Sequence, residues 1–195
     1  MSETSDLLTA EALEASDWCN RVNALLPDSL LPSPEDYDED DLPREALEDV
    51  CEEILSQPKA IAHPDWSKLL RALVELSENY WELTEDAYGE ALDPDDAADD
   101  EGGVVDMIVD LGLSTIEDAF RLLAEPAAVQ RHDWPSLVRF VLQEKNARFG
   151  SSLFLSFGWE EADELFTAPH VRAHPEASEL WREANEILPL ESTSP

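Results

Sequence analysis

An internal repeat limits the folds open to this chain more than any other feature of its sequence. Residues 54–75 are ILSQPKAIAHPDWSKLLRALVE, and residues 122–143 align with them without a gap as LLAEPAAVQRHDWPSLVRFVLQ. A looser third copy, LFTAPHVRAHPEASELWREA, occupies residues 165–184. Each copy has an apolar pair, a proline, a short connector and an acidic residue that opens an amphipathic run. This order predicts a helical hairpin in each copy.

Apolar residues spaced three and four apart predict helices in most of the remaining chain. The expected helices are 5–26, 43–55, a helix from 66 that ends between 81 and 91, 115–124, 134–149, 152–166 and 175–188, while residues 104–111 fit either a helix or a strand. We therefore predict an all-α fold: one compact, irregular domain over residues 1–195, with about seven to nine helices and helix-hairpin pseudo-repeats. The copies are 68 and then 43 residues apart, whereas regular solenoids keep a single period.

Negative charge is the second unusual property. The 195 residues include 46 acidic and 12 basic side chains, a net charge of −34. Residues 1–101 hold 30 of the acids and 5 of the bases, so the acidic field belongs mainly to the N-terminal half. Repulsion of this size costs folding stability and exceeds what solubility needs, which suggests that another function maintains it.

The size of the charge restricts the choice of partner. Duplex DNA carries one charge per ~1.7 Å of axis, so a charge of −34 corresponds to roughly 58 Å of duplex. A compact chain of this length is only about 40 Å across, so its charge density rivals that of DNA. Direct binding to nucleic acid or to an anionic membrane is therefore not expected. A basic protein partner is the natural complement.

Acidic runs with interspersed aromatic residues are the candidate binding site, within an acidic N-terminal half whose predicted loops are 27–42 and 92–103. Carboxylates can steer a basic partner, and aromatic rings can anchor it. The candidate partner-binding residues are Glu35, Asp36, Tyr37, Asp38, Glu39, Asp40, Asp41, Glu82, Glu85, Asp86, Tyr88, Glu90, Asp93, Asp95, Asp96, Asp99, Asp100 and Glu101. A charge run is often only a solvated face, and this alternative stays open.

No catalytic, metal or cofactor site is predicted. The chain has no P-loop, no dinucleotide-binding glycine pattern, no GxSxG and no HExxH. An EF-hand frame that starts at Asp93 places alanines at its fifth and sixth positions, so it does not fit. His63 and His174 share one repeat position, with His132 one place off, and we expect these rings to bond to backbone or carboxylate groups.

Rare basic and aromatic residues recur at fixed places in the copies. Arg71, Arg139 and Arg182 occupy one repeat position, which predicts guanidinium groups held by carboxylates between helices. Trp66 and Trp134 each follow the acidic residue directly and are expected to anchor the core.

These features favour a non-catalytic acidic protein that occupies a basic, nucleic-acid-acting partner. An immunity protein or antitoxin against a toxin nuclease would fit, as would a DNA mimic. The alternative is an acidic chaperone or adaptor for a secreted effector. No secretory signal or membrane-spanning run is found, and Cys19 and Cys51 form no disulfide framework, so a cytoplasmic location is expected. The oligomeric state is left open.

Overall fold

The protein is helical throughout the residues that its structure describes. The computed structural model describes residues 6–26, 47, 50–76, 115–149 and 159–187, and no strand is found within them. The predicted all-α, multi-helix class is therefore confirmed. None of the described helices is both long enough and apolar enough to cross a lipid bilayer.

The described residues form four units, which we number in chain order: unit 1 (6–26), unit 2 (47–76), unit 3 (115–149) and unit 4 (159–187). At the centre of each unit is a short helix: α2 (Ala10–Glu14), α5 (Pro58–Ile61), α8 (Pro126–Val129) or α11 (Pro169–Arg172). A longer helix follows it. In units 1 to 4, in that order, the longer helix is α3 (Trp18–Asn23), residues 66–76, α9 (Trp134–Phe149) and α12 (Ala177–Ile187). In units 2, 3 and 4 another helix precedes the short helix. These preceding helices are, in that order, η3 (Val50–Leu55, a π-helix), residues 115–123 and α10 (Trp159–Thr167).

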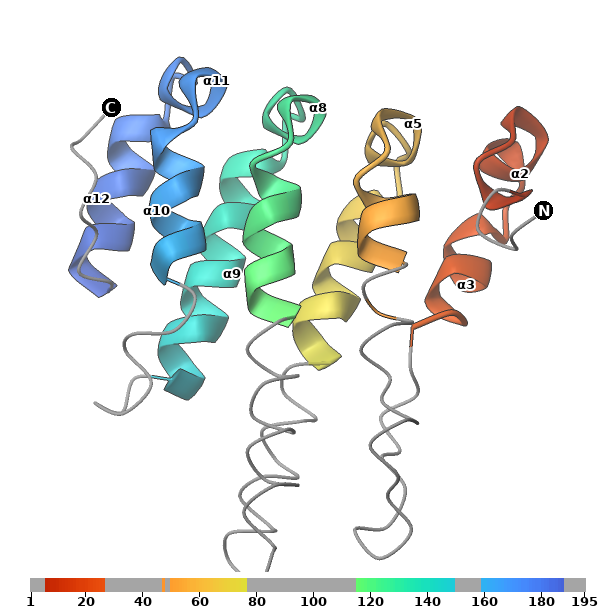
Figure 1. Cartoon of the computed structure of the whole chain (residues 1–195), viewed down its shortest axis with the longest axis horizontal. Helices are drawn as coiled ribbons and strands as arrows, with labels where there is room; N and C mark the ends of the chain where they lie inside the picture. Colours follow the sequence, from red (N-terminus) through yellow and green to blue (C-terminus); the bar gives the residue numbers. More distant parts are fainter. Residues whose placement is uncertain (1–5, 27–46, 48–49, 77–114, 150–158, 188–195) are drawn as a thin grey trace, which may run out of the picture.

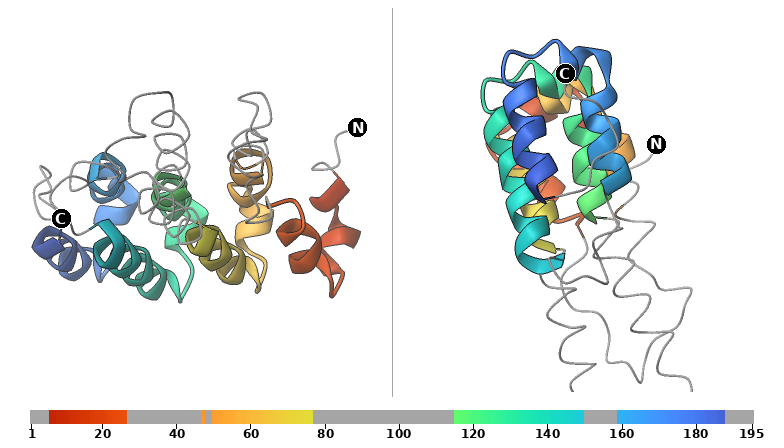
Figure 2. Two further views of the ribbon diagram at one scale, coloured as in Figure 1. Left: turned by 90° about the horizontal axis from the view of Figure 1, so that it is seen from below. Right: turned by 90° about the vertical axis from the view of Figure 1, so that its left-hand side faces the viewer.

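The four units stand side by side in a single row, with the N-terminal unit at one end and the C-terminal unit at the other (Figure 1). Their short helices share one edge of the row, where α5 contacts α8 and α8 contacts α11. The helices before and after the short helices form two layers, as the views along and across the row show (Figure 2). The repeated hairpin thus becomes a stack of helix pairs.

The prolines of the repeat begin the short helices. Pro58, Pro126 and Pro169 each occupy the first turn of their helix, after a residue with extended backbone geometry. Proline suits this place because its fixed φ is already helical and its missing N–H would have no partner in the helix. Unit 1 has no such proline; there the Thr9 hydroxyl accepts a hydrogen bond from the Ala12 N–H and caps α2 instead.

The prediction of one continuous helix at residues 5–26 was wrong. The chain forms α2, turns at residues 15–17 and then forms α3, because Ala15 is extended with ψ at 134°. The apolar periodicity continued across this turn since residues on both sides of it face the same core. Leu7, Trp18 and Val22 are all buried. Unit 1 is therefore a further copy of the hairpin, in addition to the three copies found in the sequence.

A buried tryptophan fixes the geometry of units 1 to 3. Trp18, Trp66 and Trp134 are fully buried, as predicted for the last two. Each indole N–H donates to the carbonyl of a leucine 11 residues earlier in the chain. The acceptors are Leu7 (3.0 Å), Leu55 (2.9 Å) and Leu123 (2.8 Å). The bond ties the start of the second helix to the residues before the short helix. In unit 4, Ala177 takes the tryptophan position, and one continuous core runs through all four units.

Candidate functional site

All of the predicted partner-binding residues, from Glu35 to Asp41 and from Glu82 to Glu101, lie outside the described residues. The predicted loops 27–42 and 92–103 and the undecided element at 104–111 lie outside them as well. The structure describes the scaffold to which these parts of the chain are attached.

The acid-rich parts of the sequence are attached to one edge of the row. Within each unit the helices are connected through the short helix, so these connections all lie on one edge (Figure 1). The chain must then leave one unit and enter the next at the opposite edge. Residues 27–46 connect units 1 and 2, and residues 77–114 connect units 2 and 3. We call these two stretches the acidic segments; their attachment points are neighbours on that edge.

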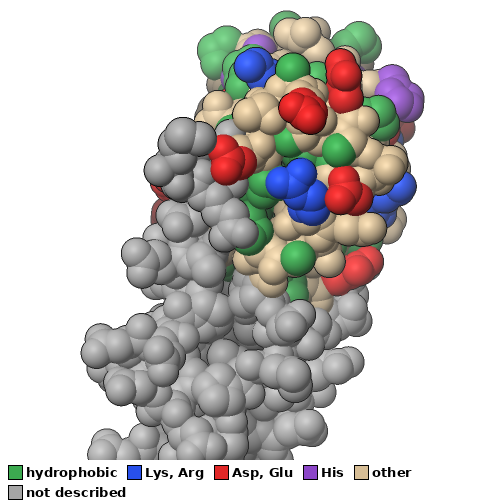
Figure 3. All heavy atoms as spheres, turned by 90° about the vertical axis from the view of Figure 1, so that its right-hand side faces the viewer, with side chains coloured by type: hydrophobic (Ala, Val, Ile, Leu, Met, Phe, Trp, Pro, Cys, Tyr) green, Lys and Arg blue, Asp and Glu red, His purple; other side chains and the backbone are tan. Residues whose placement is uncertain are grey.

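The charge of the protein is divided unevenly between scaffold and segments. The described residues contain 21 acidic and 11 basic side chains, whereas the rest of the sequence contains 25 acidic residues and a single basic one, Arg44. The acidic segments alone have 21 of these acids. The described surface at the N-terminal end of the row carries acidic, basic and apolar side chains side by side (Figure 3). Most of the charge excess therefore belongs to the acidic segments.

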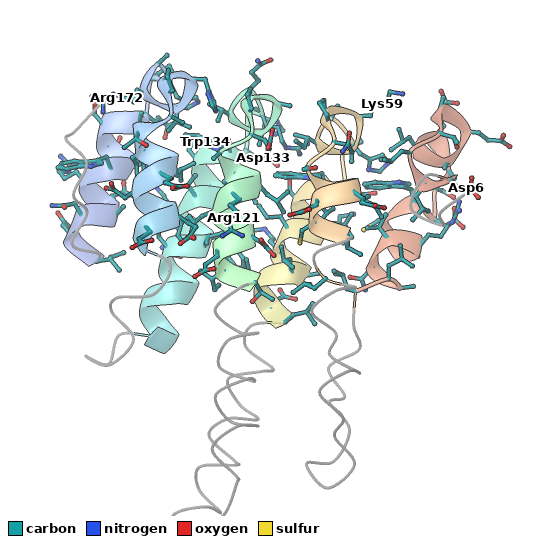
Figure 4. The ribbon with its side chains drawn as sticks, viewed as in Figure 1. Asp6, Lys59, Arg121, Asp133, Trp134 and Arg172 are labelled. Carbon is teal, nitrogen blue, oxygen red and sulfur yellow. The ribbon has the colours of Figure 1, made fainter. Side chains whose placement is uncertain are left out.

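Several basic side chains of the scaffold are engaged by its own carboxylates. Arg121 lies between helices 115–123 and α10 (Figure 4) and contacts Asp118 at 3.1 Å and Glu161 at 3.2 Å. Partial burial would lower the pKa of Arg121, but these carboxylates outweigh it and raise the pKa. Lys68 pairs with Asp65 at 2.5 Å within the first turn of its helix. These cations neutralise local carboxylates of the scaffold.

The three arginines at one repeat position have three different environments. Arg139 is held by Glu183 at 2.8 Å and Glu176 at 3.3 Å, so the prediction of a guanidinium held between helices is confirmed for this residue. For Arg71 the prediction was wrong: its guanidinium lies 4.3 Å from the centre of the Phe140 ring in the next unit. Arg182 is exposed, and no ion pair to it is found among the described residues.

A second repeat position joins the units to one another. The residue three places before each tryptophan position packs on the tryptophan of the preceding unit, and we call this set of contacts the stacking ladder. His63 packs on Trp18 and His174 packs on Trp134, with ring centres 4.2 Å and 4.7 Å apart. The guanidinium carbon of Arg131 lies 5.3 Å from the centre of the Trp66 ring. Unit 1 has Ala15 at the stacking position, and unit 4 has Ala177 at the tryptophan position. The ladder therefore has one contact at each of the three joints.

Arg131 makes the central joint the most extensively hydrogen-bonded of the three described. Its guanidinium donates to Asp133 at 2.9 Å, to Ser67 at 2.8 Å and to the carbonyls of Ile61 and His63 in unit 2. The Ser67 hydroxyl also donates to Asp133. Burial would raise the pKa of Asp133, but the hydrogen bonds from Arg131 and Ser67 outweigh it and lower the pKa to about 2. Asp133 therefore links units 2 and 3 as a carboxylate.

Backbone hydrogen bonds to histidine were predicted, and the structure confirms them. The Nδ1 atom of His63 accepts from the Asp65 N–H at 3.1 Å, and that of His174 accepts from the Glu176 N–H at 3.2 Å. His170 contacts the Ala124 carbonyl through Nε2 at 2.5 Å. In the part of the chain that is described, no group of three or more His, Cys, Asp or Glu side chains is arranged to hold a metal ion.

The sequence holds a signal for unit 1 that the three copies of the repeat do not show. The dipeptide Asp-Trp occurs three times, ending at Trp18, Trp66 and Trp134. Aligning the chain on this dipeptide adds unit 1 to the repeat. The ungapped alignment of residues 54–75 with residues 122–143 already pairs His63 with Arg131, so it places Arg131 at the stacking position. Comparison with known proteins adds no relative: no protein-family model, curated protein or solved structure matches the chain.

Proposed function

We propose that this protein is a non-catalytic acidic binding protein that occupies a basic, nucleic-acid-acting protein. Its role would be that of an immunity protein, an antitoxin or a DNA mimic. One observation carries the proposal: the two acidic segments, with 21 acidic residues and one basic residue, are attached at neighbouring joints on one edge of the helical row. Charges of like sign that are attached close together can add to a single field.

The engagement of the scaffold's cations supports the same proposal. Arg121, Arg131, Arg139 and Lys68 form ion pairs within the scaffold, and Arg71 lies over an aromatic ring. The acidic segments themselves contain only Arg44 as a cation. Their carboxylates therefore outnumber the basic side chains available to neutralise them. A basic partner protein would supply the missing positive charge.

The physical mechanism is electrostatic capture followed by docking. A field of one sign raises the association rate with an oppositely charged partner, and added salt screens it over about 8–10 Å. Tyr37 and Tyr88, two of the aromatic residues in the segments, would then supply apolar anchoring. We place this binding in the cytoplasm, where the thiols of Cys19 and Cys51 would stay reduced.

The test is affinity capture from the native host, followed by mass spectrometry, with three baits in parallel. The first bait is the wild-type chain. The second replaces Asp36, Asp38, Asp40 and Asp41 with asparagine in the first acidic segment. The third is the matched control: it removes four exposed carboxylates from the scaffold by replacing Glu52, Glu75, Glu160 and Glu164 with glutamine. The second and third baits have the same net charge.

The proposal predicts a basic protein that the wild type and the scaffold variant capture and that the segment variant captures several-fold less. Equal capture by all three baits would contradict it. Capture of a non-basic protein that responds only to changes in apolar surface would instead favour the chaperone or adaptor alternative.

A further inference from the structure

Each acidic segment connects two different units of the row. Residues 27–46 extend from the end of unit 1 to unit 2, and residues 77–114 extend from the end of unit 2 to unit 3. Packed helices lie about 8–10 Å apart, which is close to the screening length of physiological salt. Charges on the two segments can therefore add to one field only while the neighbouring units stay close together. The joints between the units control this spacing.

The central joint, between units 2 and 3, is the one that the more acidic segment bridges. It separates the two ends of residues 77–114, which hold 13 of the 21 acidic residues of the segments and no basic residue. The joint between units 3 and 4 is different, because residues 150–158 connect these units and contain no charged side chain. A change at the central joint therefore moves an acidic segment, whereas a change at the joint between units 3 and 4 moves neither segment.

Two contacts along one pair of helices hold the central joint together. At the first turn, Asp133 accepts hydrogen bonds from Arg131 and from the Ser67 hydroxyl of unit 2. Further along the same two helices, the guanidinium of Arg71 lies 4.3 Å from the centre of the Phe140 ring. Asp133 lies toward the edge of the short helices, opposite the edge where the segments are attached (Figure 4). Contacts at two heights fix the angle between the helices as well as their separation.

Arg131 supplies most of the hydrogen bonds across this joint. Its guanidinium donates to Ser67 and to the carbonyls of Ile61 and His63 in unit 2, while Asp133 of its own unit holds it in place. The side chain is only 12% exposed. A guanidinium is planar and has five donors in a fixed geometry, so these bonds allow little movement of unit 2 against unit 3. An imidazole, which occupies this repeat position at the other two joints, has only two ring nitrogens.

We propose that Arg131 is a positioning residue for the edge to which the acidic segments are attached. By fixing the angle between units 2 and 3, it keeps the two segments close enough to act on a basic partner as a single surface. Helix 66–76 is about 16 Å long at ~1.5 Å per residue, so a small rotation at the Arg131 end displaces the attachment of the segment at the other end. This inference rests on the proposed function, because it concerns the same acidic segments.

Distances between spin labels on the full chain test the positioning without a partner. The labels are attached through Asn23→Cys in unit 1 and Gln143→Cys in unit 3, two exposed positions, after alanine has replaced the two native cysteines. Arg131→Leu should broaden the distribution of distances between the labels. Arg139→Leu is the matched control: it removes the same charge at the contact between units 3 and 4, so the distribution should stay as in the wild type. An unchanged distribution in Arg131→Leu, or equal broadening in both variants, would overturn the inference.

Binding of a rigid cationic probe tests the consequence for function. The probe is an alanine-based helical peptide of about 20 residues with a stripe of lysines; it is about 30 Å long, so it can contact both segments at once. Isothermal titration calorimetry at low salt compares the dissociation constants of the variants. Arg131→Leu should weaken binding about fivefold, and Arg139→Leu should leave it unchanged. Ser67→Ala is a milder second variant that changes no charge, and it should weaken binding by about twofold.

A double-mutant cycle separates positioning from a general loss of stability. In the segment variant, whose residues 27–46 have lost four carboxylates, Arg131→Leu should weaken binding of the probe less than about twofold, because the second segment then binds nearly alone. Equal weakening in both backgrounds, or equal weakening by Arg131→Leu and Arg139→Leu, would overturn the inference and leave the proposed function intact. A segment variant that binds the probe as tightly as the wild type would instead contradict the proposed function, and this inference with it.

Discussion

At the scale of single residues, the recurrent indole hydrogen bond explains why tryptophan rather than phenylalanine fills the centre of units 1 to 3. Its N–H reaches a leucine carbonyl before the short helix, and no phenylalanine can replace that donor. Position alone showed that Trp66 and Trp134 would be buried. It did not show the bond, because the acceptor is a backbone atom that carries no sequence signal.

Replacing Trp66 with phenylalanine should lower the free energy of unfolding by about 1–3 kcal/mol, because the buried Leu55 carbonyl loses its partner. Chemical denaturation of the wild type and the variant measures this difference. Trp181→Phe is the control: this ring is only partly buried at the margin of the core, so its loss should cost less. Equal losses in the two variants would argue against a special role for the bond.

Asp133 provides a test of the central joint by pH. Its pKa of about 2 in the folded protein lies below its ordinary value of 3.8, so the ionised form stabilises the fold above pH 3.8 by about 2 kcal/mol, and this contribution is lost as the pH falls toward 2. The free energy of unfolding of the wild type should therefore exceed that of Asp133→Asn at pH 6, and the difference between the two should be smaller at pH 3. Urea denaturation at each pH measures it. A gap that stays constant with pH would be inconsistent with this linkage.

At the scale of elements, repeat position predicts backbone geometry better than it predicts side-chain partners. The prolines and the Asp-Trp dipeptide mark where short helices begin and where the next helix starts, which is local chemistry and therefore recurs. The partner of a side chain belongs to the neighbouring unit, and neighbours differ. Arg139 meets glutamates from unit 4, whereas Arg71 meets Phe140 from unit 3. Unit 1 was not recognised as a copy of the repeat because residue 10 is an alanine where the other units have a proline.

The difference between equivalent arginines gives a prediction for the contact between α9 and α12. Arg139→Leu should lower the free energy of unfolding by about 1 kcal/mol, because the side chain is partly exposed and its ion pairs are partly screened. Arg182→Leu, at the same repeat position but exposed, should change it by less than about 0.5 kcal/mol. Thermal or chemical denaturation compares them. A larger loss for Arg182 would mean that the ion pairs on Arg139 do not hold the helices.

At the scale of the whole molecule, the row of units separates a scaffold with 21 acidic and 11 basic side chains from segments with 21 acidic residues and a single basic one. Composition predicted the size of the charge and its bias to the N-terminal half. It could not predict that both acidic segments are attached at one edge, because that depends on where each hairpin turns. The candidate residues from Glu35 to Glu101 remain predictions, since they lie outside the described residues.

The central claim is that charge in the acidic segments drives capture of a basic partner, and the association rate constant tests it most directly. With the captured partner in hand, stopped-flow mixing between 50 and 300 mM salt should show a steep fall in that rate for the wild type. The segment variant should associate several-fold more slowly at 50 mM salt, and the scaffold variant should follow the wild type. A rate that is independent of salt and equal in all three proteins would contradict the account.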